Sequence, residues 1–230
     1  MSDATALDEP PLHAWADVLE AAAAGTRFDR IRVIAETAST QDAAARLAAG
    51  RPGLVVVAGR QTAGRGRHGR KWADTAAHGL AMTLTVDGAI DDRTLALAAG
   101  LAALRAAEAA LGDPTPSPLG LKWPNDVIER PSAEARDLAG ESPRKLAGVL
   151  VERRGDLALI GIGINVRQWE TDWPAALGAR GLSLRMLGST ASRLEVAGRL
   201  LIGLDEALAL DGERLAAAWI HNEVQTTESR

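Results

Sequence analysis

The sequence contains no cysteine, few aromatic residues and no long apolar segment, and each absence excludes a class of protein. Without cysteine, the chain has neither disulfide bonds nor a thiolate metal site. Aromatic residues make up only 3% of the chain, which argues against a nucleic-acid-binding module that stacks bases. No run of about 18 apolar residues occurs, and the N-terminus resembles neither a signal peptide nor a membrane anchor. We therefore expect a cytoplasmic protein that binds neither DNA nor a membrane.

The composition is that of a globular protein with a slight acidic excess. The chain has 230 residues, of which 47% are hydrophobic and 24% are charged, with a formal net charge of −4. This length suffices for a substantial core in one or two domains. The four histidines are scattered without the spacing of metal ligands. Any concentration of positive charge is therefore local, and it indicates a discrete anionic ligand.

Helix and strand patterns alternate along the chain and predict an α+β fold, a mixed β-sheet flanked by helices. Apolar runs and alternation predict strands, and a hairpin turn is expected at Gly155-Asp156. Ser39 is a predicted helix N-cap, and Gly25 and Gly50 are predicted helix stops. The predicted strands span residues 31–36, 54–59, 79–86, 119–123, 126–129 and 145–166, the last as a hairpin; the predicted helices span residues 14–25, 39–50, 91–112 and two segments of 189–222.

The segment GRQTAGRGRHGRKW, residues 59–72, concentrates glycine and positive charge directly after a predicted strand. It satisfies G-x-G-x-x-G, but no apolar helix follows, so a Rossmann site is weakly supported. A P-loop is excluded, because Arg65 and Gly66 stand where lysine and serine or threonine are needed. Glycines let a backbone approach a ligand closely, and arginines donate several hydrogen bonds to phosphate or carboxylate. The segment is either a solvated basic loop or an anion-binding loop.

Three later segments add candidate residues. LKWPND, residues 121–126, places a lysine and an acid at a proline turn between strands, where plain turn chemistry is the alternative. RKLAG, residues 144–148, begins an apolar strand with Lys145, which could also be ordinary surface. GIGIN, residues 161–165, puts two glycines inside a strand, which indicates either a bulge or the close approach of a ligand.

Together these segments, in this order, resemble the catalytic domain of biotin protein ligase, also called biotin–[acetyl-CoA carboxylase] ligase. STQD, residues 39–42, is similar to the Ser-Thr-Asn segment of that family, and the resemblance covers roughly residues 30–210. It implies a fold like that of class II aminoacyl-tRNA synthetase catalytic domains. It also implies ATP-dependent activation of biotin as biotinyl-5′-AMP, with Mg²⁺ as the accompanying ion. Biotin would then pass to a lysine of a biotin carboxyl carrier protein or acyl-CoA carboxylase subunit.

The resemblance also implies which residues form the site. Positive charge has to screen the attack of a carboxylate on a phosphate and stabilise the charge that develops there. The implied catalytic residues are Lys145, Arg65, Arg67 and Asp126. The implied biotin-binding residues are Ser39, Thr40, Gln61, Gly64, Arg65, Lys145, Gly148 and Gly161. The implied ATP-binding residues are Arg67, Arg70, Trp72, Lys122, Asn125 and Asn165, with Trp72 packing on adenine. The loop is expected to act as a mobile lid over the adenylate.

The sequence departs from the family pattern at several points. Gln41 stands where the family usually has asparagine, so its amide reaches one methylene further. We expect an N-terminal extension over residues 1–29, a catalytic domain over 30–222 and a polar tail over 223–230. On this reading the helix-turn-helix domain is missing, the C-terminal SH3-like domain is absent or truncated, and residues 130–143 form a long exposed loop. A lipoate or octanoate ligase, a non-catalytic biotin-binding or adenylate-binding protein and a homodimer remain open.

Overall fold

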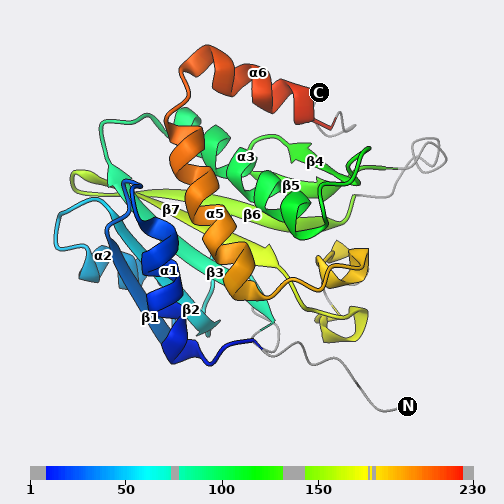
Figure 1. Ribbon diagram of the computed structural model, residues 1–230, viewed down its shortest axis with the longest axis horizontal. Helices are drawn as coiled ribbons and strands as arrows, with labels where there is room; N and C mark the ends of the chain where they lie inside the picture. The colour runs from blue at the N-terminus through cyan, green and yellow to red at the C-terminus, as the bar shows by residue number, and fades with distance from the viewer. Residues whose placement is uncertain (1–8, 74–77, 132–142, 176, 178–179, 225–230) are drawn as a thin grey trace.

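A seven-stranded mixed β-sheet organises the molecule, with helices on both of its faces (Figure 1). The computed structural model describes residues 9–73, 78–131, 143–175, 177 and 180–224. The strand order across the sheet is β1-β2-β3-β7-β6-β5-β4. The strands are β1 (Arg30–Thr37), β2 (Leu54–Gln61), β3 (Gly79–Asp87), β4 (Leu119–Lys122), β5 (Asp126–Glu129), β6 (Lys145–Arg154) and β7 (Leu157–Asn165). The predicted mixed sheet is confirmed, as is the hairpin turn, in which Gly155 has φ 58°.

The helices also begin and end close to where the sequence predicts. Ser39 caps α2 by accepting a hydrogen bond from the Gln41 amide, and Asp91 caps α3 in the same way from Thr94. The α-helices are α1 (Trp15–Ala23), α2 (Thr40–Leu47), α3 (Asp92–Ala110), α5 (Arg193–Leu208) and α6 (Gly212–Asn222). Short 3-10 turns are η1 (Leu12–Ala14), η2 (Arg67–Gly69), η3 (Glu170–Asp172) and η5 (Arg185–Leu187). No helix among the described residues is long and apolar enough to span a membrane.

The two faces of the sheet differ in what covers them, because neighbouring residues of a strand point to opposite sides. On β2, Val55 and Val57 belong to the main core with α1, α3 and α5, whereas Leu54 and Val56 pack with α2. Figure 1 shows α1, α3 and α5 side by side across the first face. On β7, Leu157 and Leu159 pack toward α2. The next residues in that alternation are Gly161 and Gly163, where the side chains of Gln41 and Trp72 lie on the second face.

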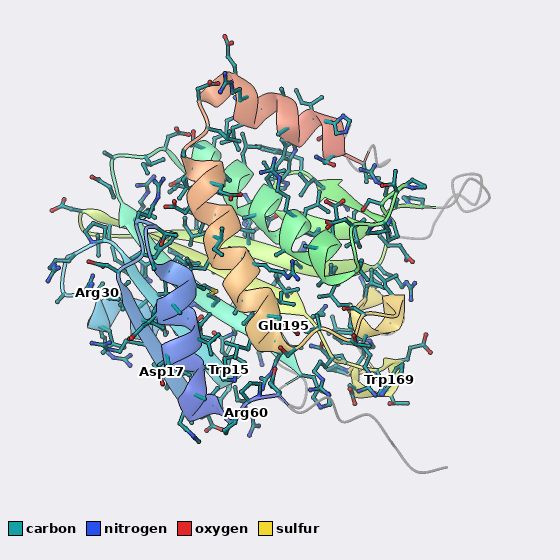
Figure 2. The ribbon with its side chains drawn as sticks, viewed as in Figure 1. Trp15, Asp17, Arg30, Arg60, Trp169 and Glu195 are labelled. Atoms are coloured by element: carbon teal, nitrogen blue, oxygen red, sulfur yellow. The ribbon has the colours of Figure 1, made fainter. Side chains whose placement is uncertain are left out.

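The segment before β1 is fastened to the first face of the sheet. Trp15, labelled in Figure 2, is the first residue of α1, and the guanidinium of Arg193 of α5 is 5.1 Å from its ring centroid. Arg193 also pairs with Glu9 at 2.6 Å, and both side chains are largely buried. The described part of the predicted extension thus packs on the predicted domain. Most of the predicted loop at 130–143 lies outside the described residues.

Candidate functional site

The floor of the candidate site consists of cross-strand pairs on β6 and β7 in which glycine recurs. Gly148 is paired with Gly163, and Leu150 with Gly161. A Cβ atom at Gly163 would lie 2.5 Å from Cε2 of Trp72, and one at Gly161 would lie 2.8 Å from Nε2 of Gln41. Both distances are too short for a real side chain. The glycines leave room for other side chains to lie flat on the sheet.

One wall of the site is polar and comes from the start of α2. Thr40 donates its hydroxyl to Oε1 of Gln61 at 3.0 Å, and it accepts the hydroxyl of Thr83 at 2.8 Å. The backbone amide of Thr40 reaches the same Gln61 oxygen at 2.8 Å. Ser39, Thr40 and Thr83 are all buried. These hydrogen bonds hold the start of α2 against Gln61, the last residue of β2.

The basic segment forms a closed hairpin over residues 64–72. Its backbone is joined by hydrogen bonds from Trp72 N to Gly64 O at 2.9 Å and from Gly66 N to Arg70 O at 2.7 Å. His68 takes φ 57° at the tip, the left-handed conformation that a tight turn requires. The residues of this segment therefore form a defined turn, on which Arg67 and Arg70 are exposed.

Arg65 fastens this hairpin to the rest of the protein. Its guanidinium makes a bidentate pair with Asp42 of α2, at 2.6 and 2.8 Å, and approaches Glu152 of β6 at 3.4 Å. The Arg65 hydrogen bond holds the pKa of the Asp42 carboxyl below its usual range, although partial burial opposes this shift. The same hydrogen bond raises the pKa of Arg65. The Arg65 side chain, predicted to face the substrate, is bracketed by two carboxylates.

Lys145 lies at the other end of the glycine floor, next to Trp72. Its ammonium is 2.6 Å from Oδ1 of Asp126, as an ion pair rather than an aligned hydrogen bond. It is also 5.5 Å from the centroid of the Trp72 ring, a cation–π distance. A Cβ at Gly148 would lie 2.9 Å from Nζ of Lys145. Gly148 thus allows the lysine to turn back over the sheet.

The proline turn between β4 and β5 approaches the site through Asn125. The side-chain NH₂ of Asn125 donates to the backbone carbonyl of Val149 of β6 at 2.7 Å. The backbone carbonyl of Asn125 accepts from Val149 N at 2.9 Å. The Asn125 Oδ1 faces the Arg67 guanidinium at 3.5 Å. The turn is therefore fixed to β6, and it presents an oxygen to an arginine of the basic hairpin.

These elements enclose a cavity of about 60 Å³, and a second cavity of about 250 Å³ adjoins it. Arg67, Asn125 and Val149 line both. The first is small because the Trp72 ring lies on its floor. A small-molecule pocket usually encloses roughly 300–1,000 Å³, so the first cavity alone is smaller than a usual ligand site. The first cavity is lined by Ser39, Thr40, Gln41, Gln61, Arg65, Gly66, Arg67, Trp72, Asn125, Lys145, Gly148, Val149, Leu150, Gly161, Ile162 and Gly163.

Most, but not all, of the predicted site residues meet at this cavity. The residues that do not line it are Gly64, Arg70, Lys122, Asp126 and Asn165, although Asp126 reaches it through Lys145. Asn165 is buried behind it, where its amide donates to the carbonyls of Lys145 at 3.1 Å and Leu182 at 2.9 Å. Asn165 thus holds the backbone of Lys145 in place. A contact between Asn165 and a nucleotide, as predicted, would require these bonds to change.

Sequence reasoning missed Asp42, Glu152 and Thr83 as parts of the site. Asp42 lies in the first turn of α2, and nothing local in the sequence pairs it with an arginine 23 residues later. Thr83 could have been found, because a hydroxyl on the buried face of a strand needs a partner. Within the described residues, no group of three or more histidine, aspartate or glutamate side chains could hold a metal ion.

Along β7, the surroundings of the cavity change from polar and neutral to cationic. Gly161 lies beside the polar wall from α2, and Gly163 lies two residues further, about 7 Å along the strand, near Trp72. Beyond it are the cationic groups of Lys145 and Arg67. An elongated molecule with a polar neutral end and an anionic end fits this sequence of surfaces. The cations could stabilise negative charge that develops at the anionic end during a reaction.

The chain is similar in sequence and in fold to known proteins. Biotin--[acetyl-CoA-carboxylase] ligase of Mycobacterium tuberculosis (strain ATCC 25618 / H37Rv) is 38% identical over 190 residues, which is 79% of this chain and 65% of that protein. Biotin protein ligase from Aquifex aeolicus in complex with biotin and ATP has a TM-score of 0.65 and 33% identity, covering 79% of this chain and 71% of that one. Biotin protein ligase from Leishmania major in complex with biotinyl-5-AMP has a TM-score of 0.67 and 25% identity, covering 87% and 85%.

The chain spans 65% of the length of the Mycobacterium tuberculosis relative. The sequence model of the biotin/lipoate A/B protein ligase family matches residues 31–167 of the 230. This match contains the polar wall, the basic hairpin, Lys145 and the glycine floor. The chain belongs to the biotin/lipoate A/B protein ligase family.

Proposed function

We propose that this protein activates biotin with ATP and transfers it to a lysine of a biotin carboxyl carrier domain. One observation carries the proposal: a single cavity joins the buried polar wall of Ser39 and Thr40 to the cations Lys145 and Arg67. Biotin has the matching shape, with a polar urea ring at one end and a carboxylate at the other. The names of the similar proteins, which are biotin ligases, support biotin as the substrate.

The residues can be assigned to the steps of this reaction. In the first step a carboxylate oxygen of biotin attacks the α-phosphorus of ATP, and pyrophosphate leaves. Lys145 and Arg67 reduce the repulsion between the two anions and stabilise the charge on the phosphate. In the second step the neutral amine of the acceptor lysine attacks the acyl carbon, AMP leaves, and the nitrogen loses a proton to solvent. The basic hairpin and Trp72 cover the mixed anhydride and exclude water from it.

Asp126 and Asn165 support Lys145 in different ways. Asp126 forms an ion pair with the Lys145 ammonium, in which Oδ1 and Nζ are 2.6 Å apart. The Asn165 amide donates to the backbone carbonyl of Lys145. A magnesium ion with ATP would bind through the nucleotide phosphates and few protein carboxylates. Asp126 has the appropriate ligand chemistry and lies beside the cavity. The ion would neutralise phosphate charge there.

Transfer of biotin to a purified carrier domain tests this proposal. The protein, biotin, ATP and Mg²⁺ are incubated with the carrier domain, and a carrier with the acceptor lysine changed to arginine serves as the control. Labelling of the first carrier alone, detected with streptavidin, supports the proposal. Absence of labelling together with tight biotin binding would favour a non-catalytic binding protein. The homodimer stays a prediction, and light scattering tests it.

A further inference from the structure

Gln41 differs from the other polar residues around the cavity in having an acceptor without a partner. Its side chain is 4% exposed and lines the cavity beside Gly161. Its Nε2 donates to the carbonyl of Leu150 at 3.0 Å. Its Oε1 is buried and accepts no hydrogen bond from the described residues. A buried amide oxygen in this state is costly unless something donates to it.

The orientation of this amide is determined by its surroundings. The two ends of a glutamine amide look alike, so the choice between them rests on hydrogen-bond partners. The Leu150 carbonyl can only accept, so the amide atom 3.0 Å away has to be the NH₂ group. The Oε1 of Gln41 is therefore the amide atom without a partner among the described residues. Gly161 allows this placement, because any side chain there would overlap the amide.

The neighbouring polar groups are already engaged. The Thr40 hydroxyl donates to Gln61 and accepts from Thr83, and the Gln61 oxygen accepts two hydrogen bonds from Thr40. The Ser39 hydroxyl accepts the amide of Gln41 to cap α2. Among the described residues of this wall, the Gln41 oxygen is the buried side-chain atom that has no hydrogen-bond partner.

We propose that Gln41 distinguishes biotin from lipoate and octanoate by accepting a hydrogen bond from an N–H of the urea ring. The inference rests on the proposed function and deepens it, since the family includes ligases of both acid classes. The ring of biotin carries two N–H donors, whereas the dithiolane of lipoate and the alkyl chain of octanoate carry none. Either of those acids would leave the Gln41 oxygen buried without a donor. Sites that hydrogen-bond a substrate group reject analogues without it for this reason.

The inference predicts a change in selectivity when the amide is removed. Gln41→Met keeps the length of the side chain and removes both polar atoms. We expect it to weaken biotin binding about tenfold or more, and desthiobiotin binding equally, because both ligands keep the urea N–H groups. Lipoate binding should stay the same or become tighter. Gln41→Leu also removes both polar atoms, with a shorter side chain, and it should weaken biotin binding too.

Calorimetric titration of each variant with biotin, desthiobiotin and lipoate tests this, after thermal unfolding has shown that the variants fold. Gln168→Met is the matched control, because Gln168 is 1% exposed, has an unpartnered Oε1 and does not line the cavity. It should leave the ratio of biotin to lipoate affinity unchanged. If Gln41→Met does not fold, Gln41→Leu decides.

Two outcomes separate the inference from the proposed function. If the folded wild-type protein binds lipoate rather than biotin, both fail. If the wild-type protein binds biotin and the Gln41 variants bind it equally tightly, the role of Gln41 is overturned and the proposed function stands. An equal loss of selectivity in Gln168→Met would also overturn it, because the effect would then not be specific to the cavity.

Discussion

The pair between Asp42 and Arg65 predicts how firmly the basic hairpin covers a bound adenylate. Asp42→Asn removes the negative charge from one side of the bidentate contact and leaves the cavity lining unchanged. The side chains of Arg65 and Asp42 are 35% and 42% exposed, so solvent screens the pair. Such pairs contribute at most about 1 kcal/mol, and the bidentate geometry places this one near that limit. The loss corresponds to an increase of about fivefold in the open fraction of the hairpin.

The consequence is measurable as the release of the intermediate. The adenylate is formed from biotin and ATP labelled at the α-phosphate, with pyrophosphatase present and no acceptor. After unlabelled ligand is added, release of labelled adenylate should be about fivefold faster from Asp42→Asn than from the wild type. Asp205→Asn is the control, because Asp205 pairs with Arg27 at 2.6 Å, away from the cavity. Equal release rates for wild type and Asp42→Asn would refute the reasoning, as would an equal increase in Asp205→Asn.

The pH dependence of this contribution follows from the lowered pKa of Asp42. A carboxyl whose pKa is lower in the folded state stabilises that state above its unfolded pKa, about 3.9. The stabilisation is lost as pH falls through the folded value, which lies below 3.8. The difference in thermal stability between wild type and Asp42→Asn should therefore be constant from pH 5 to 8 and shrink below about pH 4. A difference that changed between pH 6 and 8 would indicate another group.

Three further variants test other parts of the site. Arg67→Ala should leave the melting temperature unchanged, because Arg67 is exposed, yet release the adenylate faster; normal retention would contradict its role. Lys145→Met should slow adenylation about 100-fold or more and also weaken biotin binding, because Lys145 faces the carboxylate; single-turnover pyrophosphate production at saturating biotin measures the rate, and an unchanged rate would remove Lys145 from the chemistry. Gly163→Ala should destabilise the protein by about 1–3 kcal/mol in denaturant unfolding, because its Cβ would meet Trp72 at 2.5 Å. Gly198→Ala, whose Cβ has no neighbour closer than 3.8 Å, should not.

Local sequence signals predicted the elements of the fold well. Ser39 is a cap because its side chain satisfies an amide at the start of a helix, and this depends on residues nearby in the chain. The Gly155-Asp156 turn is equally local. The strand order was not predictable in this way. The parallel pairing of β1 with β2, and the position of β7 between β3 and β6, depend on contacts between distant segments.

In the candidate site, too, local motifs could be recognised in the sequence, whereas contacts between distant segments could not. Arg65, Arg67 and Lys145 were found because motifs place them, and all three line the cavity. The partner of Arg65 could not be found, because the closed hairpin decides which carboxylate the guanidinium reaches. Asn165 lies in the right segment, but its amide turns to the backbone of Lys145 rather than to the cavity. The motif identified the segment, and packing decided the direction of the side chain.

Exchange of labelled pyrophosphate into ATP, dependent on an added acid, tests the central claim most directly. The exchange reports the first half-reaction without an acceptor, and biotin, lipoate and octanoate can be compared on the same folded protein. The account predicts exchange with biotin and little with the other two acids. Exchange with lipoate or octanoate but not biotin would contradict it, and exchange with none of the three would leave this protein without the proposed activity.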